Sequence, residues 1–179
     1  MGGRLYTRLG DDGTTFCLAL GSGRPVRVPK SHPLIELLGT IDEANSMLGL
    51  ARAYARVEGL DELDGDLRWM QRLLFNVGFS ITTGEARVSD EDVRRLESLA
   101  DKYYGEALRR FVLPSGGLTA SSLHVARAMV RRAERRMVSA VEKGFKLDNI
   151  LLKTMNRASD ALFAMAVYAA RKSGKLEEV

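Results

Sequence analysis

The sequence contains few of the residues that build disulfides, zinc sites and Cys/His catalytic centres. Its 179 residues include one cysteine, Cys17, and two histidines, His32 and His124. A single cysteine cannot form an internal disulfide, and so few thiol and imidazole groups do not match the ligand spacing of a zinc cluster. The sequence therefore argues against structural zinc and against catalysis by a Cys/His pair.

Long apolar runs are also absent. No stretch is long enough to span a bilayer, and the beginning of the chain is too polar to be the apolar part of a signal peptide. We therefore expect a cytoplasmic protein that does not bind membranes. The formal net charge of +4 favours anionic partners, but it does not distinguish nucleotides from nucleic acid or acidic proteins.

Proline is scarce, and its positions divide the chain. Pro25, Pro29 and Pro33 lie near the start and Pro114 stands alone, so the long stretches between them are free to be helical. Apolar residues recur there with helical spacing, which predicts helices over residues 34–54, 60–81, 89–109, 119–143 and 149–172. We expect an all-α fold, an up-and-down five-helix bundle. The whole chain, 1–179, forms one predicted domain, with an N-terminal segment over 1–33 and the bundle over 34–173.

The predicted fourth helix carries charged residues on the border of its apolar stripe. In LHVARAMVRRAERRMVSAV, the helical period places Arg127, Arg131 and Glu134 together along that border, whereas Arg132 and Arg136 point another way. One interpretation is a solvated basic helix with internal Glu–Arg pairs. The other is an anion site beside the core, for which the planar and permanently charged guanidinium group is suited.

Polar residues also interrupt the apolar stripes of the first and last predicted helices. Asp42 and Asn45 lie at the edge of the stripe in GTIDEANS, and Asn156 and Asp160 share a face with Phe163. Polar groups at such positions need partners. Hydrogen bonds between helices within the core and contacts with a ligand are both consistent with this pattern.

The segment before the bundle is rich in glycine, aspartate and threonine. It reads YTRLGDDGTTFCLALGSG and lacks the G-K-[ST] of a Walker phosphate loop. A two-stranded hairpin or a tight turn explains this composition. A phosphate-binding nest also explains it, because glycines let backbone N–H groups converge on phosphate oxygens. The hydroxyl, carboxylate and ammonium groups of that nest would come from Thr14, Thr15, Asp11 and Lys30.

Four blocks of the sequence together carry a family resemblance. They are YTRLGDDGTT, GTIDEANSMLGLAR, FVLPSGGLTASSLHVARAMVRRAERR and NRASDALFAMA, and they cover most of the chain from Tyr6 to about Arg171. In this order they resemble the PduO-type ATP:cob(I)alamin adenosyltransferases. The resemblance implies a five-helix bundle assembled as a homotrimer, with active sites between adjacent subunits. It also implies transfer of the 5′-deoxyadenosyl group of ATP to the cobalt of cob(I)alamin, release of triphosphate, and an unidentified cob(II)alamin reductase as partner.

The same resemblance implies roles for individual residues. The N-terminal segment would hold ATP through residues that match the nucleotide segment of the family: Thr7, Arg8, Gly10, Asp11, Gly13, Thr14, Thr15 and the phosphate-binding Lys30. Arg131 would contact the triphosphate, Glu134 would help to hold the nucleotide and Mg²⁺, and Asn156 would lie at the nucleotide site. Arg127 would pair with Asp42 of a neighbouring subunit. Phe111 would act as the aromatic wedge that removes the lower axial ligand of cobalt.

The chemistry implied by the resemblance is consistent with the scarcity of catalytic side chains. Because cobalt itself is the nucleophile, the protein needs no catalytic Cys, Ser or His. What the residues must supply is alignment of the ribose carbon with cobalt and stabilisation of charge on the departing triphosphate.

The sequence departs from the family pattern in the loop before the fourth helix, where Ser115 stands in the place of a glycine. The geometry of this corrinoid-side loop therefore does not follow from the resemblance. Two other functions also fit the residues. One is a bundle that binds ATP or a corrinoid without turnover, and the other is a basic helical protein that binds nucleic acid through its fourth helix. Nucleic-acid binding would show a steep salt dependence and little preference for ATP.

Overall fold

The computed structural model describes residues 6–18 and 24–179, so the predicted N-terminal segment reaches outside the described residues at 1–5 and 19–23. Within the described residues there are five helices, α1 (Pro33–Val57), α2 (Asp61–Thr83), α3 (Asp90–Tyr104), α4 (Leu118–Glu142) and α5 (Asn149–Lys172). Two short antiparallel strands precede them, β1 (Thr14–Leu18) and β2 (Pro25–Pro29). The predicted all-α, five-helix bundle is confirmed.

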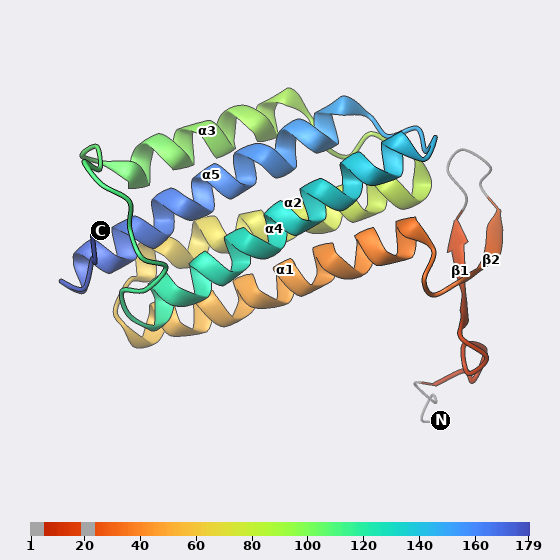
Figure 1. Cartoon of the computed structure of the whole chain (residues 1–179), viewed down its shortest axis with the longest axis horizontal. Coiled ribbons are helices and arrows are strands. Elements are labelled where there is room, and N and C mark those ends of the chain that lie inside the picture. Colours follow the sequence, from red (N-terminus) through yellow and green to blue (C-terminus); the bar gives the residue numbers. More distant parts are fainter. Residues whose placement is uncertain (1–5, 19–23) are drawn as a thin grey trace.

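The helices alternate in direction along the chain. α1, α4, α5 and α3 lie side by side in that order, and α2 packs against α1 behind them (Figure 1). No helix in the described part of the chain is long and apolar enough to cross a membrane. In this arrangement α1 and α2 share one outer face of the bundle, and α4 and α5 share another.

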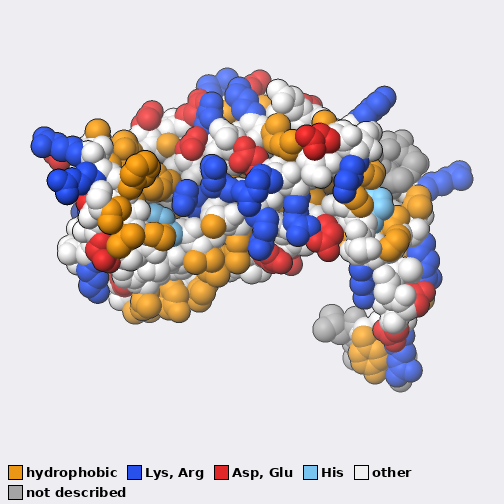
Figure 2. Space-filling model, in the orientation of Figure 1, with side chains coloured by type: hydrophobic (Ala, Val, Ile, Leu, Met, Phe, Trp, Pro, Cys, Tyr) orange, Lys and Arg blue, Asp and Glu red, His pale blue; other side chains and the backbone are white. Residues whose placement is uncertain are grey.

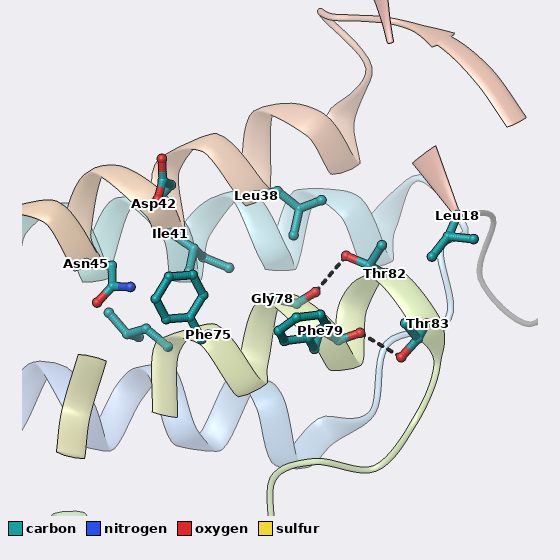
Figure 3. A pocket seen from close by; sticks show the side chains of 11 residues that line it. Leu18, Leu38, Ile41, Asp42, Asn45, Phe75, Gly78, Phe79, Thr82 and Thr83 are labelled. Carbon is teal, nitrogen blue, oxygen red and sulfur yellow. Dashed lines mark hydrogen bonds between the residues drawn. The ribbon is translucent and has the colours of Figure 1, made fainter. Parts of the chain in front are cut away.

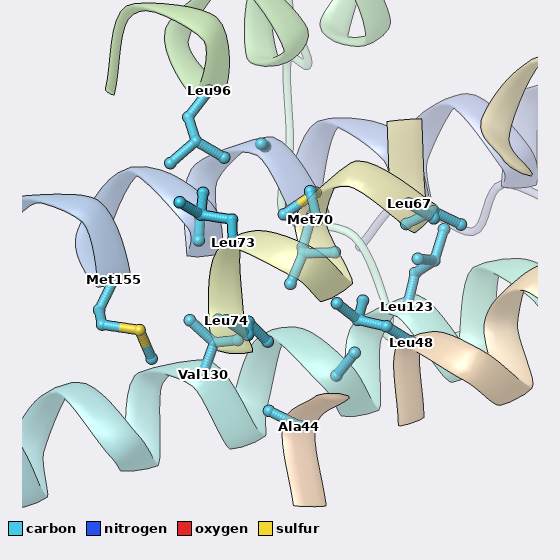
Figure 4. Packing of buried hydrophobic residues seen from close by; sticks show 14 of the residues in the cluster. Ala44, Leu48, Leu67, Met70, Leu73, Leu74, Leu96, Leu123, Val130 and Met155 are labelled. Carbon is cyan, nitrogen blue, oxygen red and sulfur yellow. The ribbon is translucent and has the colours of Figure 1, made fainter. Parts of the chain in front are cut away.

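Leucine and methionine side chains fill the space between the helices (Figure 4). Leu48 of α1, Leu74 of α2, Leu123 of α4 and Met155 of α5 are all fully buried. Burial of each such side chain stabilises the fold by about 1.5–3 kcal/mol. This core fixes the rotation of each helix about its axis, and it thereby decides which polar residues reach the surface.

The helix boundaries follow local signals at most ends. α1 begins at Pro33, and the His32 side chain accepts a hydrogen bond from the backbone N–H of Leu34. α3 begins with a capping box in which Ser89 and Asp92 satisfy each other's backbone N–H groups. Four of the predicted helices lie within a few residues of α1, α2, α4 and α5.

The predicted end of the third helix, at about residue 109, is wrong. α3 ends at Tyr104, and Gly105 follows with a φ of +62°. The guanidinium of Arg171 in α5 donates hydrogen bonds of 2.6 Å to the carbonyl of Tyr104 and 2.7 Å to that of Glu106. These contacts satisfy carbonyl groups that a longer helix would use internally. A residue far away in the sequence therefore stabilises the point at which α3 stops.

The two strands form a hairpin beyond the start of α1 (Figure 1). Thr14 pairs with Pro29 and Leu18 with Pro25. Of the two interpretations of the N-terminal segment, the hairpin is thus present. A hairpin does not exclude a phosphate-binding role for its residues.

Candidate active site

A cavity of about 490 Å³ opens between the loop that precedes α4 and the outer faces of α4 and α5. Figure 2 shows lysine and arginine side chains gathered along the middle of the face over α4. The cavity has both polar and apolar walls, lined by Tyr104, Leu108, Arg110, Phe111, Val112, Arg127, Arg131, Ser159, Asp160 and Phe163. The structure therefore brings together three of the predicted residues, Phe111, Arg127 and Arg131. We call this space the arginine cavity.

Arg127 is the most constrained charge of the arginine cavity. Its Nε atom is buried without a hydrogen-bond partner among the described residues, and its guanidinium lies 5.6 Å from the centre of the Phe163 ring. Burial, together with the nearby Arg131, lowers the pKa of Arg127. Among the described residues, neither arginine forms an ion pair with a carboxylate, as Arg132 and Arg136 do with Glu43 and Glu36 of α1.

A partly desolvated cation without a counterion is unfavourable in a protein of this kind. The arrangement of Arg127 and Arg131 is therefore suited to an anion that is not a part of the same chain. Of the two interpretations of the fourth helix, an anion site explains these two arginines. Cross-helix ion pairs explain Arg132 and Arg136.

Phe111 lies on the loop between α3 and α4 and is 86% exposed. A phenylalanine that served only to plug the core would be buried. Its ring lines the arginine cavity instead, at the entrance of the loop that continues to Pro114. The exposed ring is thus available to a ligand with an apolar surface.

Glu134 and Asn156 meet across the interface of α4 and α5. The Asn156 side-chain amide donates a hydrogen bond of 2.9 Å to the Glu134 carboxylate, and its oxygen accepts one of 2.7 Å from Arg157. No group of three or more His, Cys, Asp or Glu side chains in the described residues is arranged to hold a metal ion. Mg²⁺ needs fewer protein ligands, because it is commonly held by one or two carboxylates together with substrate phosphates. Glu134 therefore fits a magnesium ion that arrives with a nucleotide.

A second hollow, of about 250 Å³, lies in the groove between α1 and α2 (Figure 3). Its walls are almost entirely apolar, and the rings of Phe75 and Phe79 are 58% and 49% exposed. Among the described residues that line it, Asp42 is the one with a charged side chain. The side-chain oxygen of Asn45, also in the lining, is buried without a partner among the described residues. We call this space the Asp42 groove.

Asp42 and Arg127 do not meet within one chain. Asp42 is exposed and forms no ion pair or side-chain hydrogen bond with any described residue. The alternative in which Asp42 forms a hydrogen bond inside the core is therefore wrong, because the core packing turns its carboxylate outward. Leu18 of β1 also lines the Asp42 groove, so the hairpin and Asp42 occupy the same side of the molecule.

The hairpin holds its polar groups in a local network. Lys30 donates a hydrogen bond of 2.8 Å from its ammonium group to the carbonyl of Gly10. Arg27 donates to the Thr14 hydroxyl and to Asp12, and the Thr14 hydroxyl donates in turn to Asp12. The hydrogen bonds from Thr14, reinforced by Arg27, lower the pKa of Asp12. This network shapes the turn around Gly13, where φ is +79°.

The other predicted residues of the N-terminal segment are at the surface. The Thr7 hydroxyl accepts a hydrogen bond of 3.4 Å from the backbone N–H of Leu9, and Arg8 has a φ of +62°, which is rare for a residue with a side chain. Asp11 is exposed and Thr15 is half-buried. None of these residues lines the arginine cavity of the same chain.

The family model described as cobalamin adenosyltransferase matches residues 5–169 of this sequence. The chain belongs to the cobalamin adenosyltransferase family. The match covers the two strands and almost all of the five helices. The arginine cavity, the Asp42 groove and residues 5–33 of the N-terminal segment are therefore inside the part of the chain that this family shares.

Named relatives in this family are similar over nearly the whole chain. The corrinoid adenosyltransferase of Bacillus subtilis (strain 168) is 39% identical over 178 residues, which cover 96% of this chain and 89% of the relative. The corrinoid adenosyltransferase MMAB of Homo sapiens is 35% identical over 190 residues, which cover 98% of this chain and 72% of the relative.

Solved structures of the family have the same fold. One is a phenylalanine-to-alanine variant of a PduO-type ATP:corrinoid adenosyltransferase from Lactobacillus reuteri, complexed with cobalamin and ATP. It has a TM-score of 0.84 and 30% identity, and the match covers 98% of both chains. An arginine-to-lysine variant complexed with ATP has a TM-score of 0.85 and 29% identity, again with 98% of both chains covered.

The structure adds residues to the candidate site that sequence reasoning did not select. The Phe163 ring lies beneath the Arg127 guanidinium, and Arg110 lines the arginine cavity. Arg27 forms an ion pair with Asp12 within the hairpin. The spacing of Asn156, Ser159, Asp160 and Phe163 along one helical face was a signal for Phe163. No comparable pattern marks Arg27, because its role depends on the pairing of two strands.

Proposed function

We propose that this member of the family transfers the 5′-deoxyadenosyl group of ATP to the cobalt of cob(I)alamin, forming adenosylcobalamin and releasing triphosphate. The observation that carries the proposal is the arginine cavity, where Arg127 and Arg131 lie beside the exposed ring of Phe111 without a carboxylate partner among the described residues. One cavity thus combines cations for a polyphosphate with an aromatic surface for a corrin ring.

The protein's part in this reaction is electrostatic and positional. Cob(I)alamin donates the electron pair that forms the Co–C5′ bond, and the C5′–O bond breaks as triphosphate departs with its electrons. No proton moves in that step, so the protein need supply only positive charge, which the arginines in the lining of the cavity provide. Arg131 would stabilise the charge that gathers on the triphosphate, and Lys30 would add a second cation from the N-terminal segment.

We further propose that the complete site forms between two copies of the chain in a homotrimer. The Asp42 groove and the hairpin lie on one side of the bundle, whereas the arginine cavity lies on another. If the groove of one subunit faces the cavity of the next, the Asp42 carboxylate meets the Arg127 guanidinium, and each gains the ion-pair partner that it lacks among the described residues of its own chain. The exposed rings of Phe75 and Phe79 supply the apolar area that such an interface needs.

In this arrangement the N-terminal segment of one subunit would cover ATP bound at α4 and α5 of its neighbour. The nucleotide contacts would come from Thr7, Arg8, Gly10, Asp11, Gly13, Thr14 and Thr15 on one side, with Asn156 on the other. Glu134 would hold Mg²⁺ together with triphosphate oxygens. Mg²⁺, when bound, would neutralise part of the charge on the triphosphate.

Phe111 is proposed as the wedge that removes the lower axial ligand of cobalt. Two of the Lactobacillus reuteri structures are substituted at a phenylalanine and one at an arginine, and those two residues are 20 positions apart in that protein's numbering. Phe111 and Arg131 are separated by the same 20 positions here. That agreement supports matching Phe111 and Arg131 to the two positions substituted in those structures.

An anaerobic absorbance assay with chemically reduced cob(I)alamin, ATP and Mg²⁺ tests the reaction. We expect loss of the cob(I)alamin band, a light-sensitive product and release of triphosphate, all dependent on the protein. ATP binding without conversion would contradict the enzyme and favour a carrier or sensor. If the protein neither binds ATP nor converts cob(I)alamin, the proposed reaction is contradicted and nucleic-acid binding is favoured. The cob(II)alamin reductase as partner and the cytoplasmic location stay predictions.

A further inference from the structure

The loop that carries Phe111 is held by the segment that follows α5. Residues 111–113 and 177–179 form a short antiparallel ladder, with a bridge between Val112 and Glu178. The backbone N–H of Val179 donates a hydrogen bond of 2.9 Å to the carbonyl of Phe111, and that of Leu113 donates one of 2.9 Å to the carbonyl of Glu177. Figure 1 shows the end of the chain beside this loop.

Side chains reinforce the ladder. The Ser115 hydroxyl donates a hydrogen bond of 2.6 Å to the Glu177 carboxylate, and the Ser173 hydroxyl donates one of 2.8 Å to the carbonyl of Gly116. Hydrogen bonds to a charged acceptor are stronger than neutral ones. The structure gives a specific partner to the hydroxyl of Ser115, which stands where the family resemblance leads us to expect a glycine.

Gly116, the next residue of the loop, packs closely against α5. A Cβ atom on Gly116 would lie 2.4 Å from the Cβ of Ala170, and the φ of Gly116 is +110°. The loop is therefore pressed against the end of α5 at Gly116 and tied to residues 177–179 on the other side. Phe111, whose own ring is exposed, is positioned through this backbone and not by packing of its side chain.

Residues on both sides of the ladder continue the surface of the arginine cavity. A hollow of about 420 Å³ is lined by Val179 together with Leu108, Arg109, Arg110 and Phe111. Three of these residues, Leu108, Arg110 and Phe111, also line the arginine cavity. Val179 thus lies next to the surface on which we place the corrin ring.

From these contacts we propose that Ser115 and Glu177, with the ladder between residues 111–113 and 177–179, are positioning residues that hold Phe111 toward the corrinoid. This inference rests on the proposed function. It has a selective consequence, because the ladder carries Phe111 on the corrinoid side of the site and none of its hydrogen bonds involves a residue proposed to contact the nucleotide. Weakening it will affect corrinoid binding and removal of the lower ligand while leaving ATP binding unchanged.

Glu177→Ala tests the proposal, with Glu178→Ala as the matched control because the Glu178 side chain has no hydrogen bond or ion pair among the described residues. The KM values for cob(I)alamin and for ATP are measured for both variants. Loss of one charge-assisted hydrogen bond at an exposed site is expected to raise the corrinoid KM of Glu177→Ala about five-fold. The ATP KM and both KM values of Glu178→Ala should equal those of the wild type.

Two further variants separate positioning from general stability. Glu177→Gln keeps an oxygen that can accept from Ser115, so it should largely restore the corrinoid KM. The absorbance change of cob(II)alamin on losing its lower ligand, in the presence of ATP, should be smaller in Glu177→Ala and in Ser115→Ala. The double variant should show no further loss, since both changes remove the same bond.

Phe111→Ala distinguishes the possible failures. Absence of conversion by the wild-type protein would overturn the proposed function itself. If the wild type is active and Phe111→Ala impairs corrinoid binding, identical behaviour of Glu177→Ala and Glu178→Ala would overturn the positioning role alone. If Phe111→Ala leaves the corrinoid KM and the cob(II)alamin spectrum unchanged, both the wedge and its positioning residues are overturned.

Discussion

The arginine cavity and the Asp42 groove differ in the sign of their unpartnered charge and in their polarity. The cavity between α4, α5 and the Phe111 loop contains the Arg127 and Arg131 guanidinium groups. The groove between α1 and α2 contains the Asp42 carboxylate in a nearly apolar wall. The charge and polarity of the two surfaces are complementary, which supports the proposal that each is one half of a site formed when copies of the chain associate.

The largest expected effect concerns the pair that joins the two halves. Asp42→Ala and Arg127→Ala should each weaken association by about 3–5 kcal/mol, because each leaves the other charge unpaired in a buried interface. The double variant should lose much less than the sum of the two. Analytical ultracentrifugation over a range of concentrations measures these changes.

A matched control for this pair is Glu43→Ala, which removes a neighbouring carboxylate that is already paired with Arg132 in the same chain. It should change association by less than about 1 kcal/mol. Strict additivity of Asp42→Ala and Arg127→Ala would contradict the pairing of the two surfaces.

Arg131→Ala tests the cation that belongs to the arginine cavity alone. Adenosyl transfer should fall about 10²–10³-fold, as happens when a preorganised donor to developing charge is removed. The fold should be retained because Arg131 is exposed and makes no ion pair with a described residue. Rates of triphosphate release and circular dichroism measure the two properties. Arg94→Ala removes an exposed arginine of α3 and should keep wild-type activity; unchanged turnover in Arg131→Ala would discard the assignment.

Gly116→Ala and Gly65→Ala compare a tightly packed position in the loop of the arginine cavity with an open position in α2. The new Cβ would collide with Ala170, so the free energy of unfolding should fall by about 1–3 kcal/mol. Gly65→Ala in α2 has no atom within 4 Å of the added Cβ and should instead stabilise the fold by up to about 1 kcal/mol. Urea unfolding of both variants measures the difference. Equal stabilities would show that the loop can shift to accommodate the added Cβ atom.

The smallest expected effect is the pH dependence of the stability that the Glu58 carboxylate contributes at the start of α4. Burial raises the pKa of Glu58, but hydrogen bonds from Thr119 and from the backbone of Leu118 outweigh it, so the net pKa lies below its usual 4.5. A lowered folded-state pKa means that Glu58 contributes stability fully above the unfolded value and loses it as the pH falls through the folded value. The stability difference between wild type and Glu58→Gln should therefore be present at pH 7 and shrink below about pH 4.5.

Thermal unfolding of the two proteins at pH 7 and at pH 3.5 measures this contribution. A difference that stays constant between these pH values would show that the carboxylate of Glu58 does not stabilise the first turn of α4 through its charge.

Helix positions were predictable because they depend on local signals. Proline and the apolar period located all five helices, and Ser89 with its following acidic residues marked the start of α3. The end of α3 was missed although Gly105 directly after Tyr104 is a local stop signal; what was not predictable is that Arg171 from α5 binds the carbonyls there. Charged residues continue the helical pattern past Tyr104, so nothing nearby in the sequence announces that contact.

The candidate site was predictable only in part, for the same reason. The border of α4 placed Arg127, Arg131 and Glu134 together, and Glu134 then meets Asn156 in the structure. The partner of Ser115 was not foreseeable, because Glu177 is brought to it by the path of the chain after α5. The separation of Asp42 from Arg127 within one chain agrees with the family resemblance, which pairs Arg127 with Asp42 of a neighbouring subunit; composition and periodicity alone did not imply it.

The sequence by itself determined the all-α class, the helix positions and the family, because these depend on residue types, their periodicity and their order along the chain. Only the tertiary structure decided that Asp42 faces outward, that Arg127 has no counterion among the described residues, and that residues 177–179 pair with the Phe111 loop. Those properties depend on the orientation of each of the five helices about its axis. The packing of all the core side chains together sets that orientation.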